Sequence, residues 1–176
     1  MQTHPSFRNE SVRLLFEAVR RLLGERGYKR RDLTWYSHSP AVIRVLRFDP
    51  GMTRFKMRFA LGIALHALDS ADDPTVWDSV RPLRCRATHP QIEDCAVSVR
   101  LERLLEDRTH YEELADFGDR TRSYSDSIPK IVEVVSSRAL PFLESFSTLD
   151  DVRRFVQSDR ASSVTIREAA KKILCT

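Results

Sequence analysis

The chain has 176 residues, of which 41% are hydrophobic and 31% are charged, and its formal net charge is +4. This composition excludes an intrinsically disordered protein, because a disordered chain has fewer apolar residues and a larger charge imbalance. A chain of this length buries a sufficient core without metals or disulfides, so we expect a single domain over residues 1–176.

The first predicted element is a helix from about residue 10 to residue 26, followed by Gly27 as a stop signal. Its apolar residues recur at helical spacing: Val12, Leu15, Phe16, Val19, Leu22 and Leu23. A single apolar stripe of this kind is typical of a helix that packs on one side only.

Two strands are predicted next, over residues 33–38 and 41–48, with Ser39 and Pro40 as the turn between them. Residues 49–51, Asp-Pro-Gly, then predict a tight reversal of the chain. The first of these strands is the one that we expect at the edge of the sheet, where an unpaired strand invites pairing with a second copy.

The clearest pattern in the chain is the strict alternation of residues 53–66, which predicts one long strand. One side is apolar: Phe55, Met57, Phe59, Leu61, Ile63 and Leu65. The other side is basic or small: Arg54, Lys56, Arg58, Ala60, Gly62, Ala64 and His66. This asymmetry predicts an antiparallel sheet that is packed on its apolar face and open on its basic face. The small residues allow another segment to pack closely against the open face.

Residues 69–82 are rich in Asp, Ser and Pro and predict a surface loop, and the last two strands are expected at residues 84–88 and 95–101. In the last strand Cys95, Val97, Val99 and Leu101 are expected to face the core, with Ala96, Ser98 and Arg100 facing outward. Residues 106–126 are polar and predict irregular structure or a marginal helix.

The C-terminal third predicts helices over residues 127–174. The first begins near Ser127 and carries Pro141, which should kink or split it. Residues 147–150 resemble a capping box that starts a short helix, and residues 164–174 supply the last helix. The resulting fold class is α+β, a two-layer sandwich in which an antiparallel sheet of four to five strands over residues 33–101 has helices packed on one face.

Several segments resemble the bacterial proteins grouped as domain of unknown function family 4304. The resemblance rests on Leu-Leu-Gly-Glu-Arg-Gly-Tyr-Lys-Arg-Arg at 22–31, Leu-Thr-Trp-Tyr at 33–36, the arginine-bearing strand at 42–48, Phe-Ala-Leu-Gly-Ile at 59–63, and Leu-Pro-Phe-Leu-Glu-Ser-Phe at 140–146 followed by Leu-Asp-Asp-Val. The family's tryptophan-bearing segment has no clear counterpart between residues 106 and 126. The resemblance implies a fold and a bacterial source but no activity.

The open basic face is the leading candidate for a binding site. Its predicted residues are Arg44, Arg54, Lys56, Arg58, Arg84, Arg86 and Arg100, with Tyr36 and His38 at one edge. Such a surface would hold phosphates or a carboxylate-rich protein, and an aromatic ring beside arginines would stack a base. The alternative is that these are ordinary solvated charges, paired with acids across the strands or partly covered by a loop.

Metal binding and catalysis find little support. Cys85, His89 and Cys95, with His66 or His110, do not have the spacing of a structural zinc site, so no metal and no cofactor is expected. No glycine-rich phosphate loop, Gly-x-Ser-x-Gly or His-Glu-x-x-His motif occurs. Adjacent acidic pairs such as Glu112 and Glu113 have diverging side chains and do not make a catalytic pair.

The function expected from these patterns is a non-catalytic binding module that uses the open basic face or edge of its sheet to hold a protein partner. Binding of nucleic acid or another polyanion through that face is the first alternative, and an enzyme of unknown chemistry is the second. The three cysteines, the polar first residues and the lack of a long apolar run predict a cytoplasmic protein without disulfides or membrane contact, either a monomer or a homodimer.

Overall fold

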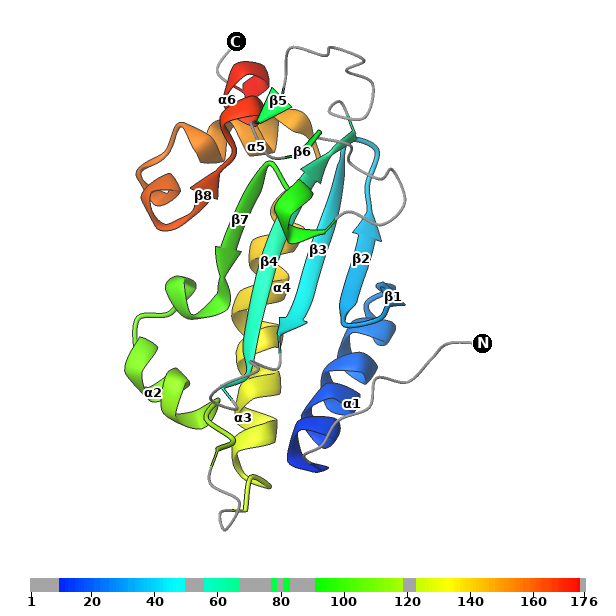
Figure 1. Ribbon diagram of the computed structural model, residues 1–176, viewed down its shortest axis with the longest axis vertical. Coiled ribbons are helices and arrows are strands. Elements are labelled where there is room, and N and C mark those ends of the chain that lie inside the picture. The colour runs from blue at the N-terminus through cyan, green and yellow to red at the C-terminus, as the bar shows by residue number, and fades with distance from the viewer. Residues whose placement is uncertain are drawn as a thin grey trace.

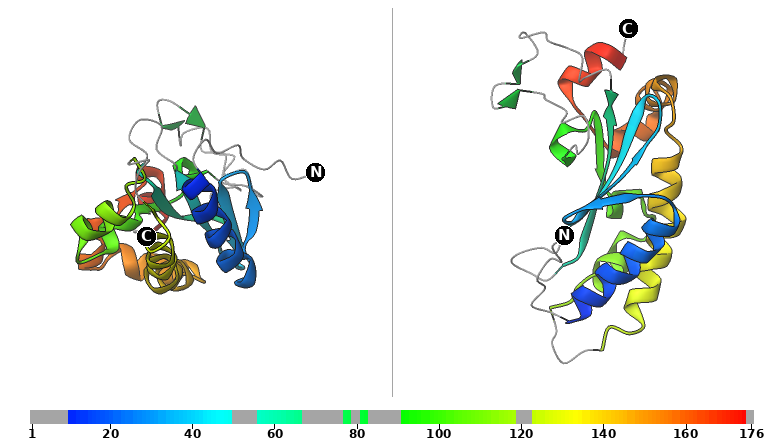
Figure 2. Two further views of the ribbon diagram at one scale, coloured as in Figure 1. Left: turned by 90° about the horizontal axis from the view of Figure 1, so that it is seen from below. Right: turned by 90° about the vertical axis from the view of Figure 1, so that its right-hand side faces the viewer.

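The computed structural model describes residues 10–49, 56–66, 77–78, 81–82, 91–118 and 123–174. An antiparallel sheet forms one layer, and helices α1 (Glu10–Glu25), α3 (Ser127–Val134) and α4 (Leu140–Glu144) cover one of its faces (Figures 1 and 2). The predicted α+β fold, with helices on one face of an antiparallel sheet, is therefore confirmed. The main sheet has six strands in the described residues, and the sequence predicts four to five.

The strands of the main sheet lie in the order β1-β2-β3-β4-β7-β8, and each neighbouring pair is antiparallel. Their bounds are β1 Lys29–Arg31, β2 Thr34–His38, β3 Val42–Asp49, β4 Arg58–Leu65, β7 Val97–Arg100 and β8 Thr165–Ile166. A separate pair is formed by β5 (Trp77–Asp78) and β6 (Arg81–Pro82). The prediction that residues 33–38 form an edge strand was wrong, because β1 pairs with β2 and takes the edge position.

Parts of four predictions lie outside the described residues: the reversal after Asp49, the beginning of the long strand at 53–55, most of the surface loop at 69–82, and the strand at 84–88. Within the described part, β4 has the predicted alternation. Its apolar side meets the helices, and Phe59, Leu61, Ile63 and Leu65 are all fully buried. Val12, Leu15, Phe16, Val19 and Leu23 of α1 pack into the same core, so both predicted stripes meet as expected.

The main helix of the C-terminal third runs through α3, a π-helical turn (η4, Val135–Ala139) and α4. Within η4 the N–H of Leu140 bonds to the carbonyl oxygen of Val135, one residue further back than in an α-helix. Pro141, which lacks an N–H, follows directly in the first turn of α4. The interruption predicted near Pro141 is thus a π-helical turn and not a break in the helix.

The remaining short elements are α2 (Arg108–Leu114), α5 (Leu149–Val156), α6 (Glu168–Leu174) and the 3-10 helices η2 (Ile92–Asp94), η3 (Leu101–Leu104) and η5 (Asp159–Ser163). A capping box precedes α5, but it lies one residue later than the predicted 147–150, with Thr148 as the cap residue and Asp151 as its partner. Residues 164–174, predicted as one helix, contain β8 before α6 begins. Among the described residues, no helix combines the length and apolarity needed to cross a membrane.

The sheet face opposite α1, α3 and α4, called the open face below, is not fully bare. Tyr36, Ile43, Val45, Ala64 and Cys95 form a second small apolar cluster there, with Ile92 packed against it. Ile92 and Cys95 belong to η2 and its end, so this short helix covers part of the open face (Figure 2). The prediction that another segment packs on the small residues of β4 is confirmed at Gly62, which lies against Cys95 and Ile92.

Candidate functional site

Among the predicted basic residues that the structure describes, Arg58 and Arg100 lie on the open face. Arg58 is opposite Asp49 on β3, and Arg100 is opposite Ala60 on β4. Lys56 lies two residues before β4 and beside α2, where its Nζ atom is 4.0 Å from the Oε2 atom of Glu112. Arg54, Arg84 and Arg86 lie outside the described residues.

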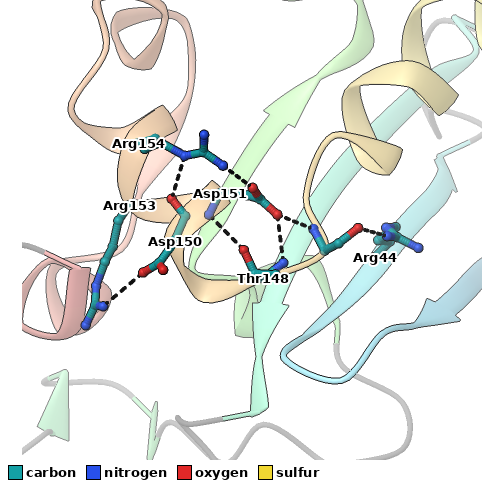
Figure 3. Close-up of polar contacts among 7 residues, drawn as sticks. Arg44, Thr148, Asp150, Asp151, Arg153 and Arg154 are labelled. Carbon is teal, nitrogen blue, oxygen red and sulfur yellow. Dashed lines mark hydrogen bonds and ion pairs between the residues drawn. The ribbon is translucent and has the colours of Figure 1, made fainter.

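Arg44 does not belong to the open face, and the prediction that it does was wrong. It is opposite Ile63, which faces the helices, and its half-buried guanidinium points to the turn after α4 (Figure 3). There its Nε atom donates to the carbonyl oxygen of Phe146 at 2.9 Å, and its Nη2 atom donates to Ser147 Oγ at 2.9 Å. Arg44 therefore ties the sheet to the end of the long helix.

The physical reason lies in the pattern of β3. Its residues are buried on both faces, so apolar alternation does not indicate which face meets the helices. Arg44 and Arg47 are three residues apart and must project to opposite faces of the strand. The arginine on the open face is Arg47, which the sequence prediction missed.

Tyr36 and His38 also differ from the prediction of a stacking edge. Tyr36 lies on the open face but is only 2% exposed, since it packs in the small apolar cluster. This burial raises the pKa of its phenol. The ring of His38 lies 6.1 Å from the ring of His66, beside the start of β3 and far along that strand from Arg47. Neither ring is available to stack a base beside the arginines.

The open face contains a groove of about 480 Å³ that runs across β3, β4 and β7. Its residues are Arg47, Asp49, Ala60, Ile92, Glu93, Ser98, Val99, Arg100, Arg103 and Thr165. The register explains how it forms: Arg47 is opposite Ala60, and Ala60 is opposite Arg100. One small residue therefore lies between two arginines in the same row of the sheet.

The dimensions of the row suit a small anionic group. Neighbouring strands are about 4.8 Å apart, so the two arginine backbones are about 10 Å apart across Ala60. Long guanidinium side chains can reach inward from both sides over that distance. Ser98 and Thr165 add hydroxyl groups at the next row, where β7 pairs with β8, and Arg103 of η3 adds a third cation to the lining.

The three arginines of the groove differ in their surroundings. Arg47 Nη1 lies 3.6 Å from Glu93 Oε1, and the two side chains are 39% and 64% exposed. In the part of the chain that the structure describes, neither Arg100 nor Arg103 has an ion pair or a side-chain hydrogen bond, and both are exposed. Two guanidinium groups of the groove thus remain open to an incoming anion.

A second, much smaller cavity of about 20 Å³ lies between β4, η3 and α2, and its lining includes Glu102 and Tyr111. Both residues are buried, at 5% and 3% exposure. Burial, followed by the nearby Glu102 carboxylate, raises the pKa of the Tyr111 phenol far above its usual range. The cavity is the size of a single water molecule and is too small for an organic ligand.

A metal site is not supported within the described ranges, where no three His, Cys, Asp or Glu side chains gather. Cys85 and His89 lie outside those ranges. Cys95 is a buried thiol in the small apolar cluster, as expected for a small core residue. Its position over the sheet differs from the prediction, because Ala96 and not Cys95 joins the main core.

Comparison with known proteins does not assign the chain to a class. It matches no protein-family model, no curated protein and no solved structure. The resemblance to family 4304 therefore stays a prediction.

Proposed function

We propose that the protein is a binding module whose open-face groove holds an acidic segment of a protein partner. The observation that carries this proposal is the row Arg47, Ala60 and Arg100, in which two arginines flank a small residue on one exposed face. Guanidinium groups favour bidentate contact with carboxylates, and Ala60 leaves room for the carboxylate between them.

The lining favours a protein over a nucleic acid. Asp49 and Glu93 lie beside the arginines and interrupt the positive charge of the groove, so its described lining is not the continuous cationic track that a phosphate backbone follows. Base stacking would require an exposed aromatic ring on this face, but Tyr36 is buried. The hydroxyls of Ser98 and Thr165 suit an acidic peptide, whose amide groups need hydrogen-bond partners as well as counter-charges.

An enzymatic function has less support from the same lining. The described residues that line the groove include neither a histidine nor a cysteine, so none of them supplies a thiolate nucleophile or an imidazole base. The Glu93 carboxylate is already paired with Arg47. A binding role needs only the arginines and hydroxyl groups that already line the groove.

The proposal includes a cytoplasmic location in a bacterium. The resemblance to family 4304 supports the bacterial source, and the odd number of cysteines, 3 in all, supports a reducing compartment. The partner is a protein of unknown identity, and the module acts as a monomer or a homodimer.

Fluorescence anisotropy with a short fluorescein-labelled oligoglutamate peptide tests the proposal. The wild-type protein is expected to bind the peptide, and Arg47→Ala/Arg100→Ala is expected to lose most of the affinity. The control is Arg13→Ala/Arg20→Ala on α1, which removes the same charge from exposed positions on the opposite side of the sheet. Equal binding by the two double variants would show that the peptide responds to net charge alone and would overturn the proposal.

A further inference from the structure

Glu93 occupies a particular place at the rim of the groove. It is the middle residue of η2, and both of its neighbours fix that helix. Ile92 packs against the small apolar cluster, and the Asp94 carboxylate accepts from the backbone N–H of Gln91 at 2.8 Å. Cys95, at the end of η2, packs its side chain against Gly62 of β4. The Glu93 carboxylate is therefore presented to Arg47 by an anchored element.

The contact that Glu93 makes is weak. Its distance of 3.6 Å to the guanidinium is longer than the 2.7–2.9 Å of a strong charge-assisted hydrogen bond. Both side chains are partly exposed, and exposed ion pairs contribute little because water and salt screen them. Such a pair can open at small cost.

A ligand carboxylate would have an advantage over Glu93. In the row Arg47, Ala60, Arg100 it would lie between two guanidinium groups, whereas Glu93 has an ion pair with Arg47 only, among the residues that the structure describes. The fixed position of η2 keeps Glu93 at the rim. Exchange of one carboxylate for the other would leave Arg47 paired before and after binding.

We infer that Glu93 is an intramolecular competitor that occupies Arg47 in the free protein and is displaced by a carboxylate of the acidic partner. This inference rests on the proposed function and adds a means of regulation to the same groove. Glu93 lowers the affinity for acidic segments and so makes binding selective for ligands that engage both Arg47 and Arg100.

The test is a double-mutant cycle of Glu93→Gln and Arg47→Ala, measured with the oligoglutamate peptide. Glu93→Gln keeps the side-chain shape and removes the competing charge, so it is expected to tighten binding by up to about fivefold, the range set by an exposed ion pair. The gain is expected to be larger at low salt. In the Arg47→Ala background the same change should have little effect, because there is no longer a shared partner.

The outcomes separate the two proposals. A gain that is equally large with and without Arg47 would indicate simple loss of charge repulsion and would overturn the competition. Weaker binding by Glu93→Gln would show that Glu93 orients Arg47 for the ligand, which also overturns it. Glu10→Gln on α1 is the charge-matched control and should leave affinity unchanged. If neither wild type nor Glu93→Gln binds the peptide, the proposed function fails and this inference fails with it.

Discussion

Cys95 lies directly against Gly62, from a different element and across the open face of the sheet. A Cβ atom built on Gly62 would overlap the Cys95 Sγ atom and lie 3.3 Å from Cδ1 of Ile92. Gly62 is opposite Val45 on one side and Ser98 on the other, in the middle of the sheet. The absence of a side chain at Gly62 is therefore what allows η2 to pack on β4 and to form one end of the groove.

Gly62→Ala is expected to destabilise the fold by about 1–3 kcal/mol, because the added methyl group must displace Cys95 or shift β4. The measurement is the free energy of unfolding from urea titration. Gly24→Ala is the matched control, since a Cβ there meets nothing within 4 Å and alanine favours the helix by about 0.5–1 kcal/mol. Adding Cys95→Ala should recover part of the loss at Gly62. Equal stability of Gly62→Ala and wild type would contradict the packing described here.

Arg44 is expected to contribute to stability and not to ligand binding. Arg44→Leu removes the donors to Phe146 and Ser147 and should cost about 1–3 kcal/mol, the usual range for hydrogen bonds from a charged group. Arg44→Lys should recover little, because an ammonium cannot reproduce the fork of two donors. Urea unfolding measures both variants, and Arg20→Ala, an exposed helix pair, is the control with an expected change below about 0.5 kcal/mol. If Arg44→Leu lost peptide affinity but kept its stability, Arg44 would be a binding residue and this prediction would be wrong.

Asp151 makes stability depend on pH at the α4–α5 turn. The backbone N–H groups of Ser147 and Thr148 donate to its Oδ2 atom at 3.0 and 2.8 Å, and these bonds hold its pKa well below the ordinary value of 3.8 (Figure 3). Because the pKa is depressed only in the folded protein, the stabilisation is fully present above about pH 4. It declines as the pH falls below that value, since the unfolded chain then binds the proton first.

Asp151→Asn should therefore be less stable than wild type at pH 7, and the difference should shrink below about pH 4. Thermal unfolding across this pH range is the measurement. Asp150→Asn is the neighbouring control, because the Asp150 side chain is largely exposed and its carboxylate accepts a long hydrogen bond of 3.3 Å from Arg153. A difference that persists unchanged to pH 2 would show that Asp151 acts through something other than its charge.

The sequence predicts β4 well because its two faces differ in chemistry. Its apolar side chains alternate with Ala60, Gly62 and Ala64, so the period of two is unambiguous and the face that meets the helices follows directly. β3 has no such contrast. With both faces buried, nothing in the pattern shows whether Arg44 or Arg47 faces outward. Only the register with β4 decides it.

The groove is harder to predict than the sheet because its residues come from separate elements. Arg103 belongs to a 3-10 helix, Thr165 to a strand of two residues and Glu93 to another short helix. Segments this short leave no periodic signal, and β8 joins the sheet beside β7 although 64 residues of sequence lie between Arg100 and Thr165. Arg100 was found because it follows the regular alternation of β7.

The alternative of nucleic-acid binding makes a quantitative prediction about salt. The groove offers three arginines, Arg47, Arg100 and Arg103. Each phosphate of a single strand that an arginine contacts releases about 0.7 counterions. Three contacts therefore limit the slope of the logarithm of the binding constant against the logarithm of the salt concentration to about −2. We expect an oligothymidylate to bind weakly, with a slope no steeper than this, and to lose its binding in Arg47→Ala/Arg100→Ala. Anisotropy at several salt concentrations measures the slope. A much steeper slope that persists in this variant would require many more phosphate contacts than the groove provides, and would move the binding surface to other basic residues of the chain.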